Sequence, residues 1–203
     1  MHVTLFGVIL FLHITVAILS FMIAGVLHVA LNTTARVRTI AEARSWSSVT
    51  HRLEPLLPFG ALLLLGFGAW LIHLRSARLA WSDGWILTSV IALVLVEAVM
   101  GALVAPRSKA LAAAIHDAPD GPVPDDIRRA STDPVVWHFA HVASFGFTGV
   151  VFLMAAKPDG VWSVVIVVVA ALIGVAVSQL QLRALSAATA GAPGRRAETA
   201  ETV

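Results

Sequence analysis

Cysteine and tyrosine are both absent from the 203 residues, and charged residues make up only 13 % of the chain. Without cysteine there is no disulfide, thiolate metal site, iron–sulfur cluster, covalently attached c-type haem or cysteine nucleophile. The absence of tyrosine excludes a tyrosyl radical and a phenolic acid. Soluble domains carry about 25 % charged residues, so this chain has too little charge to cover a water-exposed surface.

Apolar residues dominate instead, at 58 % of the chain, with a mean hydropathy of +0.87. A bilayer core about 30 Å thick is crossed by roughly 20 apolar residues of helix. Five segments meet this requirement, namely residues 3–31, 55–73, 84–105, 135–156 and 160–182. The sequence therefore predicts an all-α, polytopic membrane helical bundle of five transmembrane helices in residues 1–183. Residues 184–203 are expected to form a disordered cytoplasmic tail.

Basic residues are distributed unevenly over the predicted loops. Eleven of the 14 Lys and Arg residues lie in the first and third loops and after the fifth span, whereas Arg75, Arg78 and Lys157 lie on the other side. The positive-inside rule then predicts that the N-terminus is outside and the C-terminus is in the cytoplasm. We expect a multi-pass protein of the inner or plasma membrane, surrounded by lipid. The scattered basic residues do not indicate nucleic-acid binding.

Besides His73 at the outer end of the second predicted span, five ionisable residues lie further inside the spans, and such residues are functional candidates because their insertion into lipid is costly. They are His13, His28, Glu97, His138 and His141. With a helical rise of about 1.5 Å per residue, His13 lies roughly 15 Å, Glu97 about 18–20 Å and His141 roughly 21 Å below the outer face. His28 and His138 are expected nearer the cytoplasm.

Three interpretations of these residues compete. His13 with His141, or His28 with His138, form depth-matched pairs that could ligate a non-covalent b-type haem. His13, His141 and Glu97 could instead form a metal site of two histidines and one carboxylate. The third alternative is a non-catalytic membrane subunit or small transporter, in which histidine and glutamate form a buried structural or proton-relay pair.

Several motifs resemble a family of predicted bacterial integral membrane proteins of unknown function. They are Leu12-His13-Ile14-Thr15, Pro55-Leu56-Leu57-Pro58 with Gly66 and Trp70, and Phe152-Leu153-Met154-Ala155-Ala156-Lys157-Pro158. The resemblance covers roughly residues 5 to 158, which makes the fifth span an addition to the family pattern.

The Leu-His opening is also distantly similar to the membrane protoporphyrinogen oxidase family and to copper-resistance proteins of the D type. The first of these resemblances implies that a first-helix histidine, here His13, holds haem. The leading hypothesis is therefore a haem b redox or electron-transfer subunit, with His13 and His141 as preferred ligands. Glu97 would tune or protonate that site, and an electron-transfer partner would dock on the fifth span.

Overall fold

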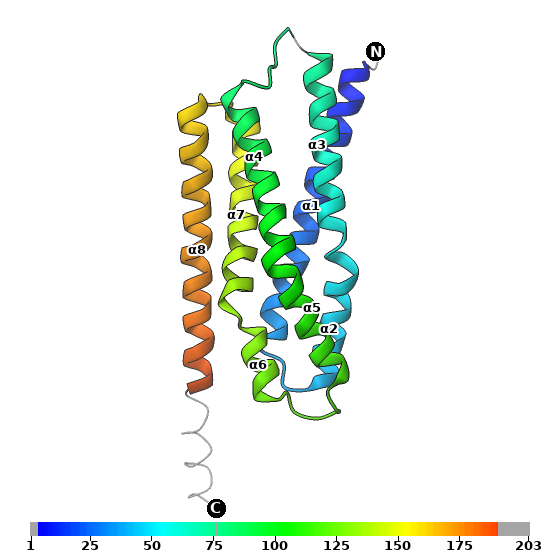
Figure 1. The fold of residues 1–203 in the computed structure, drawn as a ribbon, viewed down its shortest axis with the longest axis vertical. Coiled ribbons are helices and arrows are strands. Elements are labelled where there is room, and N and C mark those ends of the chain that lie inside the picture. The colour runs from blue at the N-terminus through cyan, green and yellow to red at the C-terminus, as the bar shows by residue number, and fades with distance from the viewer. Residues whose placement is uncertain (1–3, 76, 191–203) are drawn as a thin grey trace, which may run out of the picture.

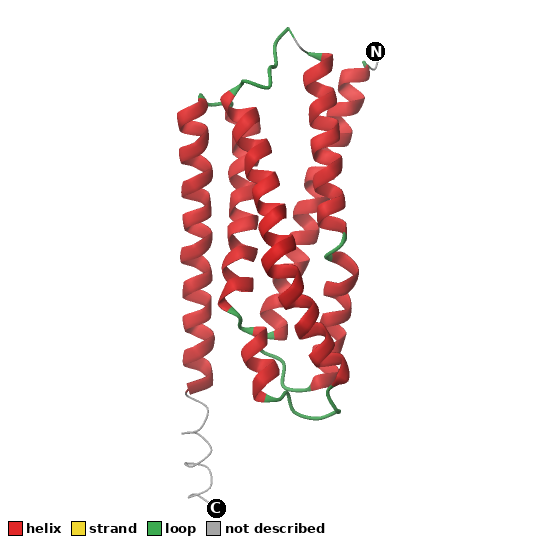
Figure 2. Cartoon of the chain, in the orientation of Figure 1, coloured by secondary structure: helices red, strands yellow, loops and turns green. Residues whose placement is uncertain are grey.

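The computed structural model describes residues 4–75 and 77–190, which form helices and connecting loops (Figures 1 and 2). In chain order the elements are α1 (Leu5–Thr34), α2 (Ile40–Leu53), α3 (Leu56–Leu74), α4 (Gly84–Val99), the π-helix η1 (Met100–Val104), α5 (Ala105–Asp117), α6 (Asp125–Ser131), α7 (Pro134–Ala156) and α8 (Gly160–Ala190). We call the end of the bundle at which α1 begins the N-terminal face, and the other end the opposite face (Figure 1).

Five helical rods within the described residues are long and apolar enough to cross a membrane. They are α1, α2 with α3, α4 through α5, α6 with α7, and α8. This confirms the predicted all-α bundle of five spans. The other four rods exceed their predicted spans, whereas α1, with 30 residues, is close to its predicted length. At about 45 Å of helix, α1 is nevertheless longer than a bilayer core of about 30 Å.

The third rod continues through Pro106, where the sequence predicts the end of a span. A proline inside an α-helix removes a backbone donor and clashes with the carbonyl one turn earlier. The preceding turn is the π-helix η1, in which the Ala105 N–H donates to the Met100 carbonyl. Pro106 takes the N2 position of α5 directly after this wider turn. Because the π-helical turn accommodates the proline, one continuous helix replaces the expected span and loop.

The last helix is also longer than expected. Residues 184–190, assigned by the sequence to a disordered tail, are the end of α8. An Ala-rich stretch favours helix intrinsically, and it follows directly from the apolar span. The rest of the expected tail, residues 191–203, lies outside the described residues.

A small apolar core closes the opposite face of the bundle. It joins α2, α5 and α6 through buried side chains of Val37, Ile40, Ala43, Ile115, Val123 and Ile127. Arg44 on α2 ties this layer together, because it donates to the Ile115 and Ala118 carbonyls and pairs with Asp120. The loops on this side are therefore held in place by packing.

The transmembrane helices form two halves. α1 packs on α3 in one half, whereas α7 packs on α4 and α8 in the other, and the halves touch each other much less than the helices within each half. Two backbone contacts fix the second half. A Cβ on Gly84 would clash with the Gly160 Cα, and a Cβ on Gly174 would lie 2.7 Å from the His141 carbonyl oxygen.

Candidate functional site

A cavity of about 1270 Å³ lies between the two halves of the bundle. Its wall comes mainly from α1, α3, α4, α7 and the junction of α2 with α3, and is mostly apolar. A typical small-molecule site occupies roughly 300–1,000 Å³, so this cavity is large enough for a bulky ligand. The ionisable side chains that line it are His13, His51, Glu54, Glu97, Lys109 and Lys157.

His13 is the single candidate histidine that lines this cavity. It lies on α1 with its ring against α3, since a Cβ on Gly68 would be 3.5 Å from the His13 Cε1. Its Nδ1 atom is buried and has no hydrogen-bond partner among the described residues, and the ring lies beside the Leu64 backbone. A buried polar atom without a partner is costly, which makes the His13 side chain a candidate for ligand binding.

His28 and His141 lie together elsewhere, between α1 and α7. Their ring centroids are 4.7 Å apart with the rings nearly perpendicular. His141 is 2 % exposed; its Nδ1 donates to the Trp137 carbonyl at 2.8 Å, and its Nε2 lies 3.1 Å from the Gln181 side-chain oxygen. The His28 Nδ1 donates to the Ala24 carbonyl at 3.1 Å, and the His28 Nε2 is buried without a partner among the described residues.

His138 faces α8 and not the cavity. Its Nδ1 donates to the Pro134 carbonyl, and the Gln179 amide donates to its Nε2 at 3.0 Å. Both ring nitrogens of His138 are therefore hydrogen-bonded, one within α7 and one to α8. The arrangement is that of a histidine which links two helices.

The structure therefore changes the histidine pairs that depth predicts. His141 pairs with His28, and neither His13 with His141 nor His28 with His138 is brought together. His13 and His28 are fifteen residues apart on α1, which separates them by about 22 Å along the helix axis. The depth estimate failed because it was counted from assumed membrane interfaces, whereas helix tilt and overhang depend on packing with neighbouring helices.

Glu97 lies midway along the cavity. It is twelve residues from both Trp85 and Lys109 on one continuous rod, or about 18 Å from each. Glu97, Gly101, Ala105 and Lys109 all line the cavity at intervals of four residues. In an α-helix, residues four apart are rotated by about 40° around the helix axis relative to each other. The wider turn of η1 offsets part of this rotation, which keeps the row on the cavity side.

The metal site expected from His13, His141 and Glu97 is not assembled. Within residues 4–75 and 77–190, no group of three or more His, Cys, Asp or Glu side chains is placed to hold a metal ion. His141 lies with His28, far from His13 along α1. His13 and Glu97 line the same cavity, yet no hydrogen bond joins them in the described part of the chain.

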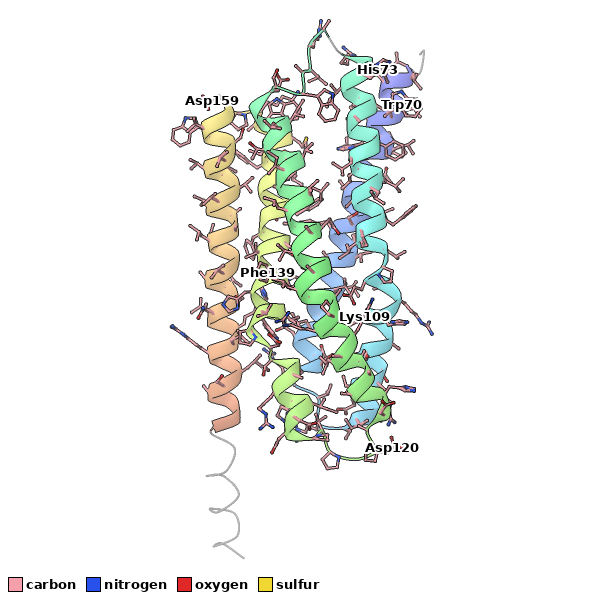
Figure 3. The ribbon with its side chains drawn as sticks, in the orientation of Figure 1. Trp70, His73, Lys109, Asp120, Phe139 and Asp159 are labelled. Carbon is pink, nitrogen blue, oxygen red and sulfur yellow. The ribbon has the colours of Figure 1, made fainter. Side chains whose placement is uncertain are left out.

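Two cationic residues of the cavity were not singled out by the sequence. Lys109 lies on α5 and Lys157 directly follows α7, so they mark its opposite ends (Figure 3 labels Lys109, and Asp159 close to Lys157). Lys157 lies in a motif that carries the family resemblance, but the sequence assigned it only to a loop. Its place in the cavity depends on how α4 packs beside α7.

Comparison with known proteins agrees with this architecture. A family model described as a predicted integral membrane protein (DUF2269) matches residues 7–158. No curated protein and no solved structure matches the chain significantly. The matched region ends at the close of α7, so α8 lies outside the family model.

Proposed function

We propose that this chain, which belongs to that family of predicted integral membrane proteins, binds haem b non-covalently in the cavity between its halves and acts as a membrane redox subunit. The observation that carries the proposal is His13, whose buried Nδ1 has no partner among the described residues while its side chain lines a large apolar cavity. Imidazole is a common axial ligand of haem iron. The resemblance of the Leu12-His13 opening to the membrane protoporphyrinogen oxidases also supports His13 as the haem ligand.

The residues favour ligation by one histidine. His28 and His141 are in ring contact at 4.7 Å, which leaves no space for a macrocycle between them. Both His141 nitrogens are engaged, as are both nitrogens of His138. His13 would therefore be the axial ligand, and His28, His138 and His141 would join helices.

Haem would supply one-electron transfer within the membrane. Glu97, midway along the cavity, is placed to hold a proton near such a group, because an isolated carboxylate is costly in an apolar environment. A redox role also requires an electron-transfer partner. We propose the outward face of α8 as its docking surface, since α8 lies outside the matched family model and is an addition to it.

An optical spectrum tests this proposal. After expression with ample haem, we expect the detergent-purified protein to show a Soret band, and dithionite to produce sharp α-bands. Haem quantified by extraction should approach one per chain. The proposal is contradicted if the protein purifies without haem and if added haemin keeps the spectrum that it has in protein-free micelles.

A second candidate, favoured by the position of Glu97 near the middle of a membrane-length rod, is a proton relay or small transporter without a cofactor. His13 and Glu97 would then exchange protons across the cavity. This alternative predicts a colourless protein whose reconstituted vesicles show proton movement that Glu97→Gln removes. A haem-loaded protein with no such movement would favour the redox subunit.

We propose that the N-terminal face lies outside the cytoplasm, in the inner or plasma membrane. The excess of Arg on the opposite face supports this orientation. Because the chain has no cysteine, single substitutions report topology without background. We expect Ser82→Cys, on the N-terminal face, to react with an impermeant maleimide in intact cells, and Asp117→Cys to react only after lysis. The reverse pattern would invert the orientation.

A further inference from the structure

Lys157 has a backbone conformation that its side chain does not favour. It ends α7 with φ 47° and ψ 54°, and its N–H donates to the Leu153 carbonyl at 2.9 Å. Among the described residues it is the only non-glycine with positive φ. Glycine is the usual residue at this type of helix end, because a Cβ disfavours the left-handed conformation. A role for the Lys157 side chain would account for a lysine at this position.

The ammonium group of Lys157 lies at the edge of the cavity. Its Nζ is 5.5 Å from the centroid of the Trp85 ring, and both residues line the cavity. No carboxylate in residues 4–75 or 77–190 forms a salt bridge with it. The two aspartates nearest in the adjoining turns serve backbone amides: Asp83 accepts from the Ala80 N–H, and Asp159 accepts from the Trp162 N–H.

This end of the cavity has a cationic character. Arg75 stacks on Phe6, which lines the cavity, with 4.3 Å from its guanidinium carbon to the ring centroid. The carboxylates that line the cavity lie elsewhere. Glu97 is about 18 Å along the rod from Trp85, and Glu54 is at the end of α2, towards Lys109. A ligand with acid groups at this end would meet positive charge, and no carboxylate lines the cavity there.

We propose that Lys157 binds the propionate carboxylates of haem, and that they point to the N-terminal face. The inference rests on the proposed function and adds the orientation of the ligand. His13 lies eight residues from the start of α1, about 12 Å along the helix, and Lys157 ends α7 at the same face of the bundle. A macrocycle bound to His13 would therefore extend towards Lys157. An ammonium–carboxylate contact at the edge of an apolar cavity is a charge-assisted hydrogen bond.

The test compares haemin with its dimethyl ester, in which both acid groups are masked, by Soret titration of the full-length protein in detergent. For each protein we compare the affinity for haemin with the affinity for the ester. We expect this ratio to be at least tenfold larger for the wild type than for Lys157→Asn. Asparagine tolerates the left-handed conformation, so this variant removes the charge and keeps the backbone. Lys157→Arg should retain most of the preference. Partition of the ligands into micelles is common to all variants and cancels in this comparison.

Two control variants locate the effect. Arg78→Asn removes an exposed cation on the same face, outside the cavity, and should leave the preference unchanged. Lys109→Asn removes the cation at the other end and should also leave it unchanged. If Lys157→Asn kept the wild-type preference, or if Lys109→Asn abolished it, the inference would be overturned while haem binding stood. If the wild type bound neither compound, the proposed function itself would fail.

Discussion

Replacing His13 with alanine is expected to weaken haem binding by about 100-fold or more, because loss of a partner behind a metal ligand already costs 10–100-fold. The Soret band should collapse or broaden, since the cavity can still hold a macrocycle without fixing its iron. The effect follows from geometry: His13 is the one candidate histidine that lines the cavity. Soret titration of the purified variant measures it.

His138→Ala is the matched control. It removes an imidazole from the membrane region, but one that contacts Gln179 and the Pro134 carbonyl. We expect its haem affinity to stay within about threefold of the wild type, given the usual scatter of distant substitutions. In His13→Gly, added imidazole should restore a six- or five-coordinate spectrum. Equal loss in His13→Ala and His138→Ala would show that the histidines act through folding.

Enlarging Gly174 is expected to detach α8 from α7. A Cβ at this position would lie 2.7 Å from the His141 carbonyl oxygen, 2.9 Å from its carbon and 3.0 Å from the Val142 nitrogen. All three are backbone atoms, so no side-chain rotation relieves the contact. We expect Gly174→Ala to destabilise the bundle by about 1–3 kcal/mol and Gly174→Leu by more. Displacement of α8 would also separate Gln181 from His141.

Thermal unfolding in detergent, followed by circular dichroism, measures this effect. Gly25→Ala and Gly25→Leu are the controls, because nothing lies within 4 Å of a Cβ at Gly25. Replacement of a mid-helix glycine by alanine contributes about 0.5–1 kcal/mol of stability, so the controls should be neutral or stabilising. A Gly174→Leu protein that melts with the wild type would mean that α8 does not cross α7 at this point.

The last helix, α8, is not part of the matched family region. It nevertheless supplies Gln179 and Gln181 to the two histidines of α7. Without α8 the second ring nitrogens of His138 and His141 would lack these partners, and unsatisfied polar groups in an apolar environment are costly. The added helix therefore completes hydrogen bonds that the matched region begins.

The sequence by itself determined the membrane class, the number of spans and the presence of ionisable groups within them. These properties are local, because hydrophobic length decides whether a segment can cross a bilayer. It also singled out His13 and Glu97, which both line the cavity. The motif that contains Lys157 could also be found from the sequence, because its residues are consecutive in the chain.

Only the tertiary structure decided which side chains meet. His28 and His141 come together because α1 and α7 pass each other near the opposite face. Counting residues from assumed interfaces had placed these two histidines at different depths. The sequence predicted that a span ends at Pro106, whereas α4, η1 and α5 form one continuous rod. The π-helical turn η1 keeps Glu97 and Lys109 on the cavity side of this rod. Helix rotation, tilt and overhang depend on packing with neighbours, so the pairings and the cavity emerge only when the helices are assembled.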